Sequence, residues 1–267
     1  MIPKIIHYVW FSDPPNYTED VLKCIESWKK HLPDYEIKLW NAKNFDFSLC
    51  EYAREAYTEG KYAFASDYVR LWALYNYGGI YLDSDIEVLK SFDELLNNKA
   101  FTGFESPDRI AAWIFASEKN NPIFKKFLDD YEGRRFVLGN GVYDLTPNPV
   151  PITNALIDRG LRLDNTYQEL EDITIYPMDY FCPFNPYRSE GDCFTDHTYA
   201  NHHFNGEWKK VHSDKERNYQ AKELKYQKIF GKKIGKKLCR NFEIIRCKGI
   251  SFWIKQRRDN KKMLSRK

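Results

Sequence analysis

Hydrophobic and polar positions in the first forty residues predict a strand, a helix and a second strand. Residues 4–11 are β-branched and aromatic, which is typical of a buried strand. Thr18 is placed to cap a helix that ends before Pro33, and residues 36–40 alternate as the next strand. The apolar face of that helix is expected to consist of Val21, Leu22, Ile25, Trp28 and Leu32.

The same alternation continues through the middle of the chain. A nearly all-apolar helix over 66–77 ends at Gly78-Gly79, and residues 80–82 follow as a short buried strand. Further strands are expected over 100–104 and 110–115, helices over 51–58, 123–131 and 151–159, and a loop region around 176–186. Strands that alternate with helices predict an α/β domain with a mostly parallel central sheet.

The composition is that of an ordinary globular protein. Of 267 residues, 43% are hydrophobic and 30% are charged, which excludes disorder and low-complexity repeats for the bulk of the chain. No apolar run approaches the ~20 residues that a membrane-spanning helix needs. The opening sequence does not have the pattern of a secretory signal, so we expect a cytoplasmic protein.

Charge is distributed unevenly between the body and the C-terminal end. Residues 228–267 contain 15 Lys and Arg against 2 Asp and Glu, whereas residues 1–227 contain 26 against 36. Within the basic segment, apolar residues recur at helical spacing at Phe230, Ile234, Leu238, Phe242 and Ile245. The sequence therefore predicts an acidic body, 1–227, followed by a basic amphipathic helical tail, 228–267.

Two carboxylates directly follow the strand at 80–82, as Asp83-Ser84-Asp85. Open α/β sheets bind ligands beyond the carboxyl ends of their strands, and oxygen donors there suit Mg²⁺ or Mn²⁺, which can hold a diphosphate. A calcium loop is a poor alternative because its sixth position needs glycine and is Val88 here. From this short pattern alone, a solvated turn with two acids stays open.

A second pair of charges interrupts the apolar helix upstream. Asp67 and Arg70 are three residues apart, so they lie on one helix face. Buried charges are rarely unpaired, so the pair is either an internal salt bridge or an acid and a base directed at a polar ligand. The spacing alone leaves both readings open.

Several segments combine into a longer pattern. They are Ala65-Ser66-Asp67, Arg70-Leu71, the run 78–85, the opening 2–11, Ser27-Trp28-Lys29-Lys30, Pro33-Asp34-Tyr35, Trp40, and 199–203 with Gly206 and Trp208. Together they resemble the DXD-containing sugar transferases of glycosyltransferase family 32. They also resemble the glucosyltransferase domain of large clostridial toxins. The resemblance covers residues 2 to about 208.

The resemblance implies roles for individual residues. Asp83 and Asp85, with His202 or His203, would hold Mn²⁺ or Mg²⁺ and the diphosphate of a nucleotide sugar, and Asp67 and Arg70 would contact sugar hydroxyls. The nucleotide sugar would also be bound by Trp10, which would stack on the base, and by Ser66, Tyr81, Asn154 and Trp208. Adjacent residues of a strand point to opposite faces, so only one of the two histidines is expected to face the metal.

The implied protein is a retaining, metal-dependent glycosyltransferase of the GT-A fold type. It would transfer a hexose from a nucleotide sugar, with UDP-sugars favoured over GDP-mannose. The acceptor would be a glycan or lipid-linked glycan in bacterial surface polysaccharide synthesis. The metal would neutralise the leaving diphosphate, and a front-face departure would need no carboxylate nucleophile.

Other readings stay open for both parts of the chain. The body could be a non-catalytic sugar- or membrane-binding protein of the same fold, or a metal-dependent phosphoesterase. The basic tail is suited to an anionic membrane, which predicts a peripheral position on the inner face of the cell membrane. The alternatives for the tail are packing on the body and nucleic-acid binding. No recognised nucleic-acid module occurs, so we expect no nucleic-acid partner.

Overall fold

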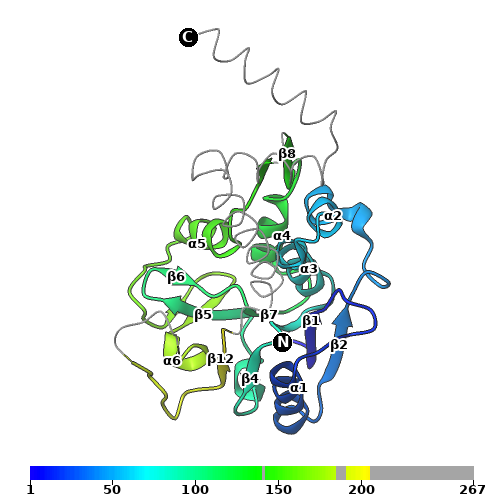
Figure 1. The fold of residues 1–267 in the computed structure, drawn as a ribbon. Helices are drawn as coiled ribbons and strands as arrows, with labels where there is room; N and C mark the ends of the chain where they lie inside the picture. Colours follow the sequence, from blue (N-terminus) through cyan, green and yellow to red (C-terminus); the bar gives the residue numbers. More distant parts are fainter. Residues whose placement is uncertain (140–141, 185–190, 205–267) are drawn as a thin grey trace, which may run out of the picture. The chain divides into compact units, whose positions relative to one another are not determined.

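The computed structural model describes residues 1–139, 142–184 and 191–204 (Figure 1). The predicted tail, 228–267, the boundary before it and Trp208 lie outside these residues. None of the helices within the described ranges combines the length and the apolar character that crossing a membrane requires.

An eight-stranded mixed sheet forms the centre of the fold. Its order is β10 (Gln168–Glu169), β11 (Thr174–Tyr176), β5 (Ala100–Ser106), β7 (Ile114–Ser117), β3 (Gly79–Leu82), β1 (Ile5–Val9) and β2 (Glu36–Trp40), with β6 (Arg109–Ile110) paired to β5. β1 is parallel to β2 and β3, and β11 is parallel to β5. β7 lies antiparallel between β3 and β5, so β1, β2, β3, β5 and β11 all run in one direction. The predicted α/β fold with a mostly parallel sheet is confirmed.

Helices cover both faces of this sheet. They are α1 (Glu19–His31), α2 (Glu51–Thr58), α3 (Tyr62–Tyr77), α4 (Pro122–Asp129), α5 (Pro149–Ile157) and α6 (Met178–Phe181), with short 3₁₀ turns at Phe47–Leu49 and Asp93–Leu95. Ile80 and Leu82 pack into a core with α1 and α6, whereas Tyr81 packs into a second core with α2 to α5. The alternation along β3 therefore sends successive side chains into different layers.

The first helix matches its prediction except for the composition of its buried face. Thr18 caps α1 by accepting a hydrogen bond from the Val21 N–H at 3.4 Å. Leu22 is 46% exposed, and Cys24 takes the buried position instead. Trp28 donates from Nε1 to the Ile86 carbonyl at 2.7 Å, which ties α1 to the segment that follows the two aspartates.

The predicted strand over 110–115 is only partly correct, because residues 111–113 form a bend between β6 and β7. The Ala112 carbonyl accepts a hydrogen bond from the Arg70 guanidinium, and the Trp113 carbonyl accepts one from the Asp83 N–H at 2.9 Å. The Ala112 carbonyl therefore faces a side chain of α3, whereas the Trp113 carbonyl continues the pairing of β7 with β3. The run is apolar because it is buried, and burial alone does not distinguish a strand from a bend.

Most other boundaries agree with the prediction to within two residues, and two differences are larger. α3 begins at Tyr62, four residues before the predicted start, and Ser66 lies inside it with Oγ donating to the Ala63 carbonyl at 2.8 Å. The region 176–186, predicted as a loop, contains α6, whose Met178 and Phe181 are buried one turn apart.

The glycine pair after α3 is required by the turn into β3. Gly78 and Gly79 have φ angles of +68° and +104°, which side-chain-bearing residues rarely adopt. A Cβ on Gly79 would lie 2.6 Å from the Ile5 carbonyl oxygen of the neighbouring strand. The pair therefore allows α3 to end and β3 to enter the sheet beside β1.

Two small two-stranded sheets stand apart from the central one. β8 (Val137–Gly139) pairs with β9 (Val142–Tyr143), and β4 (Ile86–Val88) pairs with β12 (Ala200–His202). In the second of these, His202 is opposite Ile86, so the C-terminal histidines are carried to the segment that follows the two aspartates.

Candidate functional site

Asp83 lies directly after β3 with one carboxylate oxygen held and the other available. Its Oδ1 accepts a hydrogen bond from the Tyr81 hydroxyl at 2.6 Å and lies 3.3 Å from Arg70 Nη2. No hydrogen bond within the described residues engages Oδ2, and the side chain is 30% exposed. Burial raises the pKa of Asp83, and the Arg70 charge offsets part of this effect. The carboxylate is thus oriented by the protein and can reach a ligand.

Arg70 joins the helix and strand parts of the site. Its Nη2 lies 3.1 Å from Asp67 Oδ1 as well as 3.3 Å from Asp83 Oδ1, and it donates to Ser66 Oγ at 3.3 Å. The guanidinium carbon lies 4.7 Å from the centre of the Tyr81 ring. Arg70 Nε is buried and has no hydrogen-bond partner within the described residues. The pair predicted on one helix face therefore is a salt bridge, and it extends to the first aspartate of the motif.

Asp67 is a largely buried acid beside this arginine. Its side chain is 14% exposed. Burial raises the pKa of Asp67 to about 7, although Arg70 opposes the shift, and the nearby Asp83 carboxylate adds to it. Its ionised form is thus stabilised mainly by the guanidinium.

Asp85 and His202 form a second buried pair. His202 Nε2 lies 3.3 Å from Asp85 Oδ1. The imidazole ring packs between two aromatic rings, with centroid distances of 4.6 Å to Trp113 and 3.9 Å to Phe204. Its Nδ1 is buried and has no hydrogen-bond partner in the described part of the chain. The ring is held by packing, with Nε2 directed at the carboxylate.

His203 makes different contacts, as the alternation of a strand predicts. Its Nε2 lies 3.0 Å from Glu87 Oε2, and its backbone N–H donates to the Asp85 carbonyl at 3.1 Å. The backbone of His203 therefore supports the aspartate, whereas its imidazole pairs with another residue.

The donors at this site fit a divalent cation that is bound together with a phosphate-bearing ligand. Among residues 1–139, 142–184 and 191–204, no three His, Cys, Asp or Glu side chains form a complete metal site. Mg²⁺, however, is commonly bound by one or two carboxylates together with substrate phosphates and water. Asp83 Oδ2 and the carboxylate of Asp85 would be the protein oxygen ligands, which are the donors that Mg²⁺ and Mn²⁺ prefer, and His202 would offer an imidazole beside them.

The remaining predicted residues lie in different places. Tyr81 and Ser66 belong to the cluster through their bonds to Asp83 and Arg70. Trp10 follows β1, is partly buried, donates to Ser12 Oγ at 2.5 Å and lies 5.0 Å from the Tyr17 ring centre. Asn154 is exposed on α5, and no side-chain contact described here joins it to the cluster.

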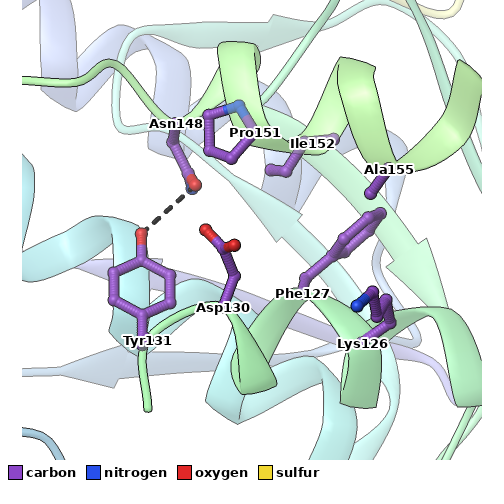
Figure 2. A pocket seen from close by; sticks show the side chains of 8 residues that line it. All are labelled: Lys126, Phe127, Asp130, Tyr131, Asn148, Pro151, Ile152 and Ala155. Atoms are coloured by element: carbon purple, nitrogen blue, oxygen red, sulfur yellow. Dashed lines mark hydrogen bonds between the residues drawn. The ribbon is translucent and has the colours of Figure 1, made fainter. Parts of the chain in front are cut away.

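Sequence reasoning missed several side chains that support the cluster. Trp113 packs on His202 and donates to Glu105 Oε2 at 3.1 Å. Asn148 Nδ2 donates to the Asp67 carbonyl at 3.3 Å, and its Oδ1 accepts from the Tyr131 hydroxyl at 3.2 Å (Figure 2). In the sequence Trp113 has the pattern of a core residue, and Asn148 before a proline has that of a helix cap, so no local signal indicates these contacts.

Comparisons with known proteins identify the region that contains the site. Residues 18–102 match the family described as "Glycosyltransferase sugar-binding region containing DXD motif". Inositol phosphoceramide mannosyltransferase 3 of Schizosaccharomyces pombe is 32% identical over 132 residues, which are 46% of this chain and 35% of that protein. An uncharacterized glycosyltransferase, L373, of Acanthamoeba polyphaga mimivirus is 27% identical over 218 residues, 74% of this chain and 82% of that protein.

A similar solved structure is that of the PaToxG glycosyltransferase, with a TM-score of 0.45 and 23% identity, covering 59% of this chain and 69% of that one. The chain spans about a third of the length of the curated mannosyltransferases that it matches. The predicted resemblance to DXD-containing glycosyltransferases is confirmed. The mixed sheet agrees with the GT-A type of fold that this resemblance implies.

Proposed function

We propose that this glycosyltransferase domain transfers a hexose from a nucleotide-sugar donor to a hydroxyl group of a glycan or lipid-linked glycan. The observation that carries the proposal is the continuous polar cluster at the carboxyl end of β3. In it Arg70 bridges Asp67 and Asp83, and Asp85 pairs with His202. Ligands of α/β sheets bind beyond this end of the strands, so the cluster is placed to receive the donor.

The geometry supports a division of roles along the cluster. Asp83 and Asp85 would bind the diphosphate end through a divalent cation. Asp67 and Arg70 would bind hydroxyl groups of the sugar, because a buried carboxylate and guanidinium provide acceptors and donors in fixed positions. Trp10 would stack on the base. Bound Mn²⁺ or Mg²⁺ would neutralise charge on the diphosphate.

The reaction that we propose retains the configuration of the donor sugar. The bond between the anomeric carbon and the diphosphate oxygen breaks, and a bond from the acceptor oxygen to that carbon forms on the same face. The acceptor proton passes to the departing phosphate. Among this chain's residues, Asp67 and Arg70 would hold the sugar in place during this step, which lowers the barrier through orientation.

Donor and acceptor are proposed on different grounds. The resemblance favours UDP-hexoses, whereas the names of the fission yeast and budding yeast relatives concern mannosyl transfer to inositol phosphoceramide. GDP-mannose is therefore the second donor to test. A lipid-linked acceptor is compatible with both lines of support, and we propose surface polysaccharide synthesis as the context.

The transferase proposal is better supported than its alternatives. The match of residues 18–102 to a glycosyltransferase region favours it over a phosphoesterase. A non-catalytic protein that binds the same donor could use the same residues, so turnover is what separates it from a transferase.

The test is a hydrolysis assay, because transferases release nucleotide slowly from a donor when water replaces the acceptor. The full chain would be incubated with UDP-hexoses and GDP-mannose, each with Mn²⁺, and the released nucleotide would be quantified. The proposal predicts release from one donor that stops when the metal is chelated. Binding of a donor without release under any condition would favour the non-catalytic alternative.

We also propose that residues 228–267 bind an anionic membrane surface, which would place the enzyme at the inner face of the cell membrane. The support is the sequence alone, with 15 basic residues against 2 acidic ones around an apolar helical face. This arrangement would bring a lipid-linked acceptor within reach of the site.

A further inference from the structure

Two polar side chains, Tyr131 and Asn148, link α3 to α4 and α5. The link reaches α3 at Asp67. Tyr131 lies just after α4 and Asn148 just before α5, and both are buried. The Tyr131 hydroxyl donates to Asn148 Oδ1 at 3.2 Å, and Asn148 Nδ2 donates to the Asp67 carbonyl at 3.3 Å. The end of α4 and the start of α5 are thus both bonded to the residue that pairs with Arg70.

Asn148 does not use its side chain in the way its position suggests. An asparagine before the first turn usually caps the helix, yet Asn148 makes no capping hydrogen bond to α5. Its orientation is determined by its partners, because a backbone carbonyl can only accept and the amide nitrogen must therefore face Asp67. The Asn148 side chain therefore bonds to Asp67, which is distant in the sequence, instead of capping its own helix.

The hydroxyl that orients Asn148 is itself held rigidly. The Tyr131 ring centre lies 5.2 Å from that of Tyr52 and 5.3 Å from that of Tyr68, and the Arg134 guanidinium carbon lies 5.1 Å from it. A ring packed on several sides has little freedom to move. The hydroxyl therefore presents one fixed donor to Asn148.

A small pocket borders this hydrogen bond, lined by residues of α4, α5 and the segments next to them (Figure 2). Its walls include Phe127 and Ile152, and the Asp130 carboxylate points into the same space. Asn148 lies in the wall of this pocket, and its hydrogen bonds to Tyr131 and Asp67 determine which way its amide faces.

We propose that Tyr131 and Asn148 are positioning residues that hold Asp67, and with it Arg70, in the place where the donor sugar is recognised. The proposal rests on the proposed function of the cluster. It predicts a selective defect: contacts to the sugar should weaken, whereas contacts of Asp83 and Asp85 to the diphosphate should not. Neither side chain needs to touch the substrate.

The test is Tyr131→Phe, which keeps the ring and removes only the hydroxyl. Tyr52→Phe is the matched control, because Tyr52 packs on the same ring and its hydroxyl donates to the Asp144 carbonyl at 3.2 Å instead of to Asn148. For each full-length variant, the KM for the donor that the wild type hydrolyses would be compared with the Kd of its nucleoside diphosphate in Mn²⁺. Amide hydrogen exchange across 67–71 would report the local order of α3.

The expected result is a donor KM raised about fivefold in Tyr131→Phe, which is the effect of one hydrogen bond, with the nucleotide Kd unchanged. Tyr52→Phe should have the donor KM and the nucleotide Kd of the wild type. Equal KM values in the two variants, or a parallel loss of nucleotide binding, would overturn the proposal. If the wild type hydrolyses no nucleotide sugar, the proposed function fails. Hydrogen exchange then decides the positioning: faster exchange at 67–71 in Tyr131→Phe than in Tyr52→Phe supports it, and equal exchange contradicts it.

Discussion

His202 Nε2 lies 3.3 Å from Asp85 Oδ1, although the two residues belong to distant parts of the chain. The contact exists because β12 pairs with β4, the strand that follows the two aspartates. The imidazole is packed against Trp113 and its Nδ1 has no partner in the part of the chain that the structure describes. A buried ring held in this way with one nitrogen at a carboxylate is suited to complete a cation or diphosphate site.

The two neighbouring histidines should therefore differ in function. We expect His202→Gln to weaken donor hydrolysis by roughly 10- to 100-fold, the usual effect of losing a group that ligates or orients at a metal site. His203→Gln is the matched control, because its imidazole pairs with Glu87 instead. The rate of nucleotide release would be measured for each variant over a range of Mn²⁺ concentrations. A larger loss of hydrolysis rate in His203→Gln than in His202→Gln would mean that His203, and not His202, serves the metal site.

Arg70 should be important for stability as well as for binding. Arg70→Lys keeps the positive charge but removes the guanidinium, whose Nη2 lies near both Asp67 and Asp83 and whose Nη1 donates to the Ala112 carbonyl. Leaving such buried acceptors without a donor costs about 1–3 kcal/mol in the free energy of unfolding. Urea unfolding would measure this loss. Arg54→Lys, at an exposed pair with Glu51, is the control and should change the midpoint little. Similar urea midpoints for both variants would contradict this prediction, because the ion pairs of Arg70 would then contribute no more to stability than an exposed pair.

These contacts also show what the sequence could predict about the site. Asp83 and Asp85 follow β3 directly, and Asp67 and Arg70 share one turn of α3, so local spacing singled them out as candidates. Their roles were predicted only from the longer pattern that resembles a family. The glycine pair between α3 and β3 likewise predicted the helix end correctly.

The supporting residues depend on contacts between distant elements. Asn148 resembles a helix cap in the sequence, but the hydroxyl of Tyr131 and the carbonyl of Asp67 direct its amide elsewhere. The run 110–115 has the apolar pattern of a strand, but residues 111–113 bend, and the Ala112 carbonyl accepts a hydrogen bond from the distant Arg70 side chain. Local patterns carry no information about such partners.

The raised pKa of Asp67 should make stability depend on pH. Its pKa is about 7 in the folded protein and near 3.8 without the fold, so folding favours the protonated carboxyl. The free energy of unfolding should then decrease as pH rises from about 4 to about 7, because the folded state binds more protons in this range. Urea unfolding at pH 5 and pH 8 would measure the difference.

Asp67→Asn should flatten this part of the pH profile. The amide cannot ionise, so the variant should lose less stability than the wild type between pH 5 and pH 8. Identical pH dependence in both proteins would mean that Asp67 stays ionised in the fold and that Arg70 outweighs its burial.

The basic tail should determine association with membranes. Because each Lys or Arg near an anionic surface contributes about 1 kcal/mol, the full chain should sediment with phosphatidylserine-containing vesicles at low salt. A chain ending at residue 227 should remain in the supernatant, and neutral phosphatidylcholine vesicles serve as the control. Equal sedimentation of the two chains would refute membrane binding by the tail.

The central claim is that Asp83 and Asp85 hold a nucleotide diphosphate through a divalent cation. The most direct measurement is titration calorimetry of UDP and GDP into the full chain, with and without Mn²⁺, and into Asp83→Asn and Asp85→Asn. We predict binding of one nucleotide that requires Mn²⁺ and weakens about 100-fold or more in both variants, because several kcal/mol of charge stabilisation are lost. Each variant should keep a cooperative unfolding transition. Nucleotide binding of equal strength without metal, or in the two variants, would contradict the account.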